Sequence, residues 1–144
     1  MDFQQVLTLA EHGDSGLQCI IGAYYNAGIN VPKDDKKAFE WYLKSAKGGN
    51  SDGQCFLASC YEEGVSKDHN KAFEWFLKSA EGGDSFGQLN VGFYYGTGVG
   101  TFKDEKKAFE WHLKSAEGGN PKAQFNIAQY YRNDRSSQMI QNVL

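Results

Sequence analysis

Apolar residues recur along this chain with the spacing of one helical face, within a stretch that occurs three times. The copies are KAFEWYLKSAKGG at 37–49, KAFEWFLKSAEGG at 71–83 and KAFEWHLKSAEGG at 107–119, and they differ at only two positions. In each copy the alanines, aromatic residues and leucine share one side of a helix, and glutamate and lysine lie on the other. Near-identity at a period in the thirties predicts a stacked array of repeats.

Aligning the chain on the glycine that closes each copy divides it into repeats. Full repeats run over 14–49, 50–83 and 84–119, with a partial repeat at 1–13 and a half repeat at 120–134. Residues 135–144 are expected to form a C-terminal tail or a capping helix, whose apolar face would be Met139, Ile140, Val143 and Leu144.

Capping residues divide each repeat into two helices. An aspartate or asparagine starts each helix, where its side chain can accept from free backbone N–H groups, and glycines end most of them. Gly28, Gly64 and Gly98 are expected to end the first helices in the left-handed conformation. The predicted fold is all-α, a right-handed α/α solenoid of helix-turn-helix repeats, with helices near 2–12, 14–27, 34–47, 50–63, 68–81, 84–97, 104–117 and 120–132.

Composition narrows the classes of function. The chain is 40% hydrophobic with a net charge of −3, and it has no clustered basic run, which argues against nucleic acid as the ligand. Neither an apolar run of membrane-spanning length nor a secretory signal is visible, so no membrane association is expected. Cys19, Cys55 and Cys60 are expected to be small buried thiols in a reducing compartment, which predicts a cytoplasmic protein.

The histidine and serine side chains, which could act in catalysis or metal binding, are not spaced as in an active site. His12, His69 and His112 form no metal or triad pattern, and His112 replaces Tyr42 and Phe76, which predicts a packed ring. A serine recurs in each L-K-S-A segment without a partner base, as a packing residue rather than a nucleophile. We therefore expect no enzyme, no catalytic residue, no metal and no cofactor.

The pattern Y-x-x-G-x-loop-K-D-x-x-K-A-F-E-W-x-L-K-S-A-x-G-G resembles the Sel-1-like repeat family over roughly residues 14–134. The matching positions are structural, and they include Tyr25, Gly28, Asp34, Ala38 and Trp41. The resemblance implies a solenoid related to tetratricopeptide repeats and an adaptor or scaffold role, including assemblies with signalling enzymes. Secreted bacterial relatives linked to β-lactam chemistry have paired cysteines in each repeat, a pattern that this chain lacks.

Variation between the repeats points to a binding surface. In the first helix of each repeat, the third, seventh, tenth and fourteenth residues after the closing glycine vary freely and share one face. We call this the free face. In such solenoids the first helices line the concave surface, and exposed aromatic residues there favour binding over idle surface. The candidate partner-binding residues are Asp52, Phe56, Ser59, Glu63, Phe86, Asn90, Phe93, Asn126 and Gln129.

The sequence thus predicts a non-catalytic scaffold or adaptor that binds a protein or peptide through the concave face of its first helices. The partner could be a signalling enzyme or another domain of a longer chain. The alternative is a self-assembly module, a weak homo-oligomer formed through open repeat ends. Within the repeats, Trp41, Trp75 and Trp111 are expected to be largely buried between neighbours, and Asn90 and Asn126 to align as a ladder. The identity of the partner does not follow from the sequence.

Overall fold

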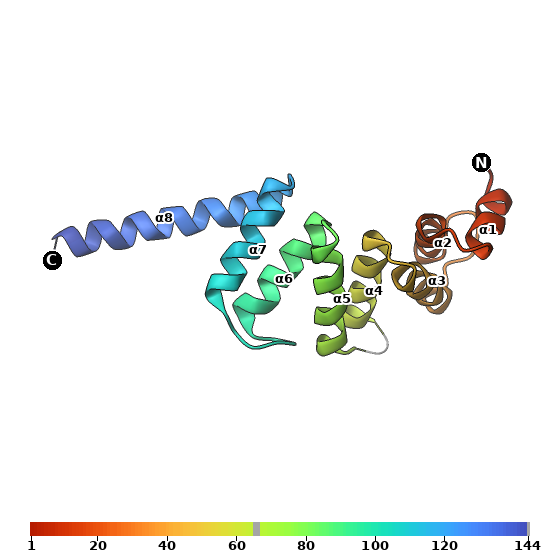
Figure 1. Cartoon of the computed structure of the whole chain (residues 1–144), viewed down its shortest axis with the longest axis horizontal. Helices are drawn as coiled ribbons and strands as arrows, with labels where there is room; N and C mark the ends of the chain where they lie inside the picture. The colour runs from red at the N-terminus through yellow and green to blue at the C-terminus, as the bar shows by residue number, and fades with distance from the viewer. Residues whose placement is uncertain (65–66, 144) are drawn as a thin grey trace.

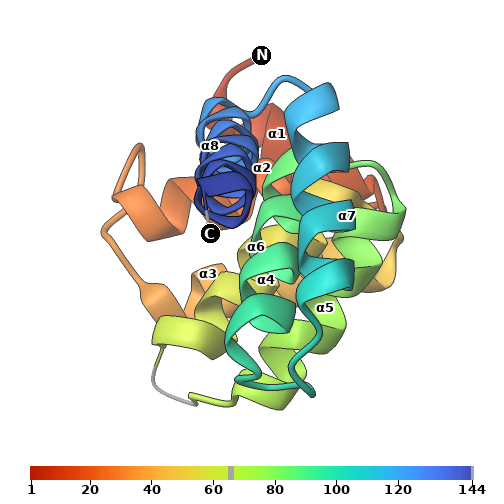
Figure 2. The ribbon, with the colours of Figure 1, turned by 90° about the vertical axis from the view of Figure 1, so that its left-hand side faces the viewer.

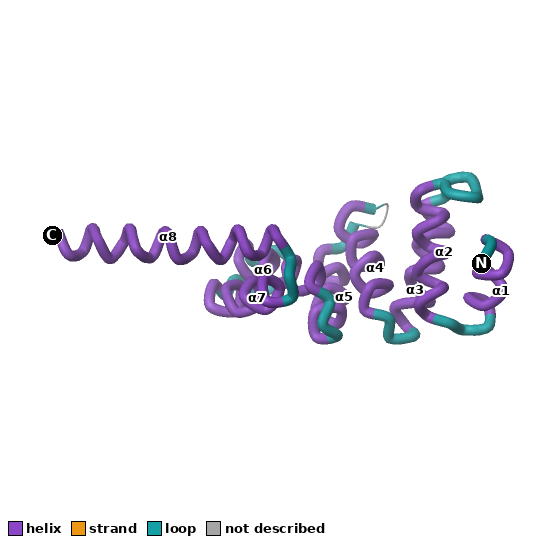
Figure 3. Tube along the Cα trace, turned by 90° about the horizontal axis from the view of Figure 1, so that it is seen from above, coloured by secondary structure: helices purple, strands orange, loops and turns teal. Residues whose placement is uncertain are grey.

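The protein is an elongated stack of helices (Figure 1). The structure, a computed structural model, describes residues 1–64 and 67–143, except for the side chains of 136–137 and 140–141. Within these ranges the secondary structure is helical, without a strand (Figure 3). The helices are α1 (Phe3–Glu11), α2 (Ser15–Ala27), α3 (Asp35–Lys47), α4 (Ser51–Glu63), α5 (His69–Glu81), α6 (Ser85–Thr97), α7 (Glu105–Glu117) and α8 (Pro121–Val143).

Two helices make each full repeat, and the repeats follow one another along the long axis. The pairs are α2 with α3, α4 with α5, and α6 with α7, as the capping residues predicted. Viewed along the axis, successive pairs are turned relative to one another (Figure 2). The chain is therefore an α/α solenoid whose repeats pack mainly on their neighbours.

Helix ends follow the predicted capping, with one exception. The Asp34 side chain accepts from the N–H of Lys37 at 3.0 Å, and Asp68 and Asp104 do the same at their helices. Gly28 and Gly98 end α2 and α6 with φ of 70° and 72°. Gly64 was predicted to be left-handed as well, and this prediction is wrong: its φ is −83° and its ψ −172°. The loop that follows α4 is two residues shorter than its counterparts, so the chain leaves the helix in an extended conformation.

The core lies at the junctions between repeats and centres on the residue after each tryptophan. Tyr42, Phe76 and His112 are buried, which confirms His112 as a packed ring. The tryptophans are only partly buried at the edge of the core. Each is covered by a lysine, for example Lys78, whose Nζ lies 4.5 Å from the ring centroid of Trp75. The lysines thus cover the partly exposed tryptophan rings through cation–π contacts.

The recurring serines hold the two helices of each repeat together. The buried Oγ of Ser45 donates to the Ser15 carbonyl at 2.7 Å, and the Oγ of Ser79 donates to the Ser51 carbonyl at the same distance. A side chain at Gly53 would collide with Ser45. The serines are thus structural, at a place where the next repeat approaches closely.

The last helix continues well past the half repeat. Asp134 stands where Gly28 and Gly98 end their helices, and without a glycine that can adopt the left-handed conformation α8 runs on to Val143. Residues 135–143 therefore extend α8 away from the array (Figure 1). Met139 and Val143, predicted to form the apolar face of a capping helix, are exposed. The Ile140 side chain and Leu144 lie outside the described residues.

Candidate partner-binding surface

Two hollows border the free face, each at a junction between neighbouring repeats. The first lies where repeat one meets repeat two, between α2, α3 and α4, and has a volume of about 790 Å³. The second lies where repeat three meets the half repeat, between α6, α7 and α8, and measures about 290 Å³. Both are built at junctions, so each draws residues that are distant in sequence.

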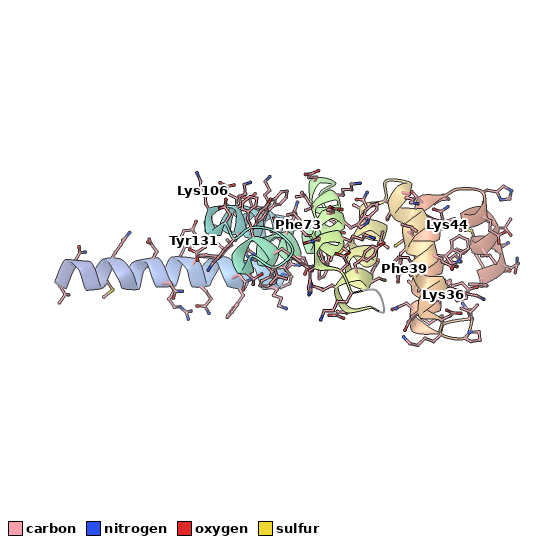
Figure 4. All side chains as sticks on the ribbon, turned by 90° about the horizontal axis from the view of Figure 1, so that it is seen from below. Lys36, Phe39, Lys44, Phe73, Lys106 and Tyr131 are labelled. Carbon is pink, nitrogen blue, oxygen red and sulfur yellow. The ribbon has the colours of Figure 1, made fainter. Side chains whose placement is uncertain are left out.

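The larger hollow, here the aromatic hollow, has three rings in its wall. The Phe56 ring stacks on the Tyr42 ring, with centroids 5.2 Å apart and planes 18° apart. Phe39, labelled in Figure 4, lies on the side of α3 that faces repeat two and meets Tyr61 edge-on at 5.4 Å. The remaining lining residues are polar, charged or small: Asn26, Lys33, Asp35, Lys36, Glu40, Ser59, Cys60, Glu63 and Gly64.

The smaller hollow, here the amide hollow, is lined mainly by polar side chains. Asn126, Gln129 and Asn133 of α8 face Thr97 and Phe93 of α6 across it. The Phe93 ring meets the buried His112 ring edge-on, with centroids 5.1 Å apart, and the Nζ of Lys122 lies 5.8 Å from the centroid of the Phe93 ring. Gly92, Gly96 and Tyr130 complete the lining.

The two hollows are counterparts in the repeat alignment. The positions of Phe56, Ser59 and Glu63 in the aromatic hollow correspond to those of Asn126, Gln129 and Asn133 in the amide hollow. These are free-face positions, so the structure brings free-face residues to the edge of a hollow at both junctions. Six of the predicted residues line a hollow: Phe56, Ser59, Glu63, Phe93, Asn126 and Gln129.

Three of the predicted residues line neither hollow. Asn90 donates from Nδ2 to the Phe86 carbonyl of its own helix at 2.9 Å, an arrangement different from the predicted ladder with Asn126. Phe86 is exposed. Asp52 shares a side-chain hydrogen bond with Asp84. Burial is the main cause that raises the pKa of the Asp84 carboxyl to about 6, and this hydrogen bond is the second.

Burial keeps the Cys60 thiol and the Tyr42 hydroxyl beside the aromatic hollow neutral. It raises the pKa of the Cys60 thiol to about 11, with a smaller contribution from Asp35, and it also raises the pKa of the Tyr42 hydroxyl. At the amide hollow, burial lowers the pKa of His112. Among the described residues no group of three His, Cys, Asp or Glu could hold a metal ion. The hollows offer rings, amides and a few charges, which is chemistry for recognition.

Sequence reasoning missed the part of the wall that lies outside the free face. Phe39 and Tyr42 come from α3, while Asn26 and Cys60 lie on first helices at positions that the free face does not include. One signal was available: Cys60 interrupts a position that is tyrosine in the other repeats, at Tyr24, Tyr94 and Tyr130.

The fold and the surface define a class, the helical-repeat proteins that present partner surfaces along an α/α solenoid. Comparison with family models gives the particular family: the Sel1 repeat model matches residues 18–50, 51–84 and 85–120. The chain belongs to the Sel1 repeat family. Proteins of this family are in general non-catalytic and act as scaffolds for protein–protein interaction.

Solved structures agree with this assignment. The Sel1 repeat protein from Oxalobacter formigenes is 32% identical, with a TM-score of 0.82 over 89% of this chain and 98% of that one. The cysteine rich protein B of Helicobacter pylori is 23% identical, with a TM-score of 0.66 over 83% of this chain and 92% of its own, and shares the fold. A comparison with curated proteins found no match.

Not one of the described helices combines the length and the apolar character that crossing a membrane requires.

Proposed function

We propose that this protein is a non-catalytic scaffold that binds a protein or peptide partner along the free face of its first helices. The observation that carries the proposal is the position of the two hollows. They open at counterpart junctions, and both are edged by the positions that differ most from repeat to repeat. Packing fixes the rest of each repeat, so the residues at the hollows are those that can be specific for a partner.

Phe56 and Phe93 are the anchors that this surface offers. Their side chains are 46% and 38% exposed, yet each ring is held in place by a buried ring, Tyr42 or His112. A fixed aromatic ring loses little conformational entropy on binding, which is why aromatic residues dominate the energetics of interfaces. The amides of Asn126 and Gln129 would add directional hydrogen bonds at the amide hollow.

The test compares partner binding by two variants. Proximity labelling and pulldown with the wild-type chain define the partners, and the Phe56→Ser, Phe93→Ser double variant should then weaken binding by about 2 kcal/mol or more, the scale of aromatic hot spots. Phe125→Ser is the matched control, because Phe125 is exposed and lines neither hollow. Circular dichroism must show both variants folded. Undiminished binding by the folded double variant would overturn the proposal.

Self-assembly remains a second candidate function, and α8 supplies an observation in its favour. Phe125 is 62% exposed, whereas Leu89, its counterpart in α6, is 4% exposed. The described residues around Phe125 leave most of its side chain uncovered. A second copy could cover it. Light scattering over a concentration series tests this, with Phe125→Ser expected to abolish any association.

The partners proposed for the scaffold are a signalling enzyme, as the resemblance implies, or another domain of a longer chain. The cytoplasmic location also stays a prediction, and cell fractionation would test it.

A further inference from the structure

Tyr24, Tyr94 and Tyr130 share one position in the first helices, and each packs against the second helix of the preceding repeat. A phenylalanine of the second helix meets that tyrosine, with centroid distances of 5.7 Å for Phe3 and Tyr24 and 6.0 Å for Phe73 and Tyr94. Phe109 and Tyr130 form the same pair at 5.3 Å. The junction of repeats one and two is the exception, because Cys60 stands at the tyrosine position opposite Phe39.

The neighbouring junction shows what the missing ring would contact. Tyr94 is 4% exposed, and its ring lies 5.8 Å from Phe76, 6.0 Å from Phe73 and 6.4 Å from His69. Its hydroxyl donates to Oε1 of Glu62 at 3.0 Å. The ring fills the space between α5 and α6 and closes that junction.

Every one of these four neighbours has a counterpart in the wall of the aromatic hollow. In the repeat alignment Phe76, Phe73, His69 and Glu62 correspond to Tyr42, Phe39, Asp35 and Asn26, and all four line the hollow beside Cys60. The site that receives a tyrosine at one junction is thus present at the other without its ring. Asn26 occupies the position of Glu62 in the alignment, and its side-chain amide oxygen can likewise accept from a hydroxyl.

We propose that the aromatic hollow is a docking slot for a tyrosine side chain of a partner segment, which takes the place of the ring that Cys60 lacks and bonds through its hydroxyl to Asn26. This inference rests on the proposed function and names the chemistry of its partner. The neutral Cys60 thiol adds an apolar floor, and the exposed Phe56 ring would cover the incoming residue.

Charge around the slot indicates what flanks the tyrosine. The lining carries three carboxylates, Asp35, Glu40 and Glu63, and two ammonium groups, Lys33 and Lys36. Lys33 is bound to Asp35 at 3.2 Å and to the Asn26 carbonyl at 2.9 Å. The rim is therefore net negative, which favours a segment with lysine or arginine beside the tyrosine.

The test uses p-cresol, the tyrosine side chain as a free molecule, in an NMR titration of the backbone amides. Wild-type protein should bind it with shifts at residues 56–64 and 35–42, and Cys60→Tyr, which supplies the ring from within, should abolish these shifts and raise the melting temperature. Cys60→Ala is the matched control and should bind as the wild type does. Asn26→Leu should weaken p-cresol roughly threefold to tenfold, as loss of one hydrogen bond predicts, and leave toluene unchanged.

A second variant keeps the proposal falsifiable if Cys60→Tyr does not fold. Tyr94→Cys opens the counterpart slot between repeats two and three, and p-cresol should bind there and restore part of the lost melting temperature. The proposal is overturned if p-cresol leaves the wild-type amides unshifted at its solubility limit, or shifts them equally in folded Cys60→Tyr.

The last arm separates this inference from the proposed function. Short peptides containing Arg-Tyr or Arg-Leu are titrated in the same way. The wild-type protein should bind the Arg-Tyr peptide more tightly than the Arg-Leu peptide, and Cys60→Tyr should bind the two with equal affinity. Equal binding of both peptides would overturn the tyrosine slot, while the proposed function would still stand or fall on the Phe56 and Phe93 variants. If light scattering shows that the chain associates with itself and Cys60→Tyr prevents it, the tyrosine comes from a second copy, and the assignment to a separate partner is overturned.

Discussion

Removing the Phe76 ring should destabilise the array more than removing the larger ring beside it. Phe76 has no exposed surface and packs among Ala58, Val91 and Tyr94 in the largest core cluster, which draws residues from α4, α5, α6 and α7. An aromatic side chain buries about 150–250 Å², and at about 25 cal/mol per Å² this corresponds to about 4–6 kcal/mol as an upper bound. Measured losses for Phe→Ala in cores are about 3–5 kcal/mol, so we expect about 4 kcal/mol for Phe76→Ala.

Trp75→Ala is the matched comparison. The Trp75 ring is partly exposed under Lys78, so its loss should lie near the lower end of the range, about 3 kcal/mol. Trp75 contacts two core clusters and Trp111 only one, so Trp111→Ala should cost less again. Urea unfolding followed by circular dichroism gives the three values, with unchanged slopes needed for the comparison. A loss for Trp75→Ala equal to or above that for Phe76→Ala, or equal losses at the two tryptophans, would refute this account of the core.

Three further predictions concern polar groups in the core and at helix starts. Ser79→Ala should lower the free energy of unfolding by about 1 kcal/mol through loss of the buried bond to Ser51, measured by urea unfolding. Burial holds the pKa of His112 below its ordinary 6.5, so the unfolded chain takes up the proton first and the folded state loses stability as the pH falls through 6.5. His112→Phe, which copies Phe76, should therefore raise the melting temperature more at pH 5 than at pH 8. The pKa of Asp84 is raised from 3.8 to about 6, because burial and the neighbouring Asp52 favour its protonated form in the folded chain. The folded state therefore has the full stability from this pair below pH 3.8 and loses it as the pH rises through 6 and the Asp84 carboxyl ionises. Asp52→Asn should thus raise the melting temperature at pH 7.5 more than at pH 4, and an equal gain at both values would contradict the role given to the pair.

Much of the fold could be predicted from local chemistry. Asp34, Asp68 and Asp104 begin their helices as predicted because an N-cap needs only one side chain and the backbone three residues on. The prediction for Gly64 is wrong because the conformation after a helix also depends on the length of the loop that follows. The C-terminal tail differs from its prediction for a similar reason. Its helix forms from contacts within the segment, but burial of Met139 and Val143 would require another element to pack against them, and both are exposed.

The candidate site was predictable only in part. The free face was visible as variation between repeats, since packing constrains the other positions. Which of its residues reach a hollow depends on how each repeat packs against the next, and on α6 only Phe93 of the predicted residues lines one, whereas Phe86 and Asn90 do not.

By itself, the sequence determined the repeat, its two helices, their caps and the family, because each of these depends on residues close together in the chain. The tertiary structure decided which rings are fully buried, where the junctions are filled and where they are open. Cys60 shows the difference. The sequence shows a cysteine where other repeats have tyrosine, but only the packing of α2 and α3 beside α4 shows that the counterparts of the tyrosine's four neighbours line an open hollow. A junction is formed by side chains from two repeats, and whether it closes depends on the volume that all of them fill together.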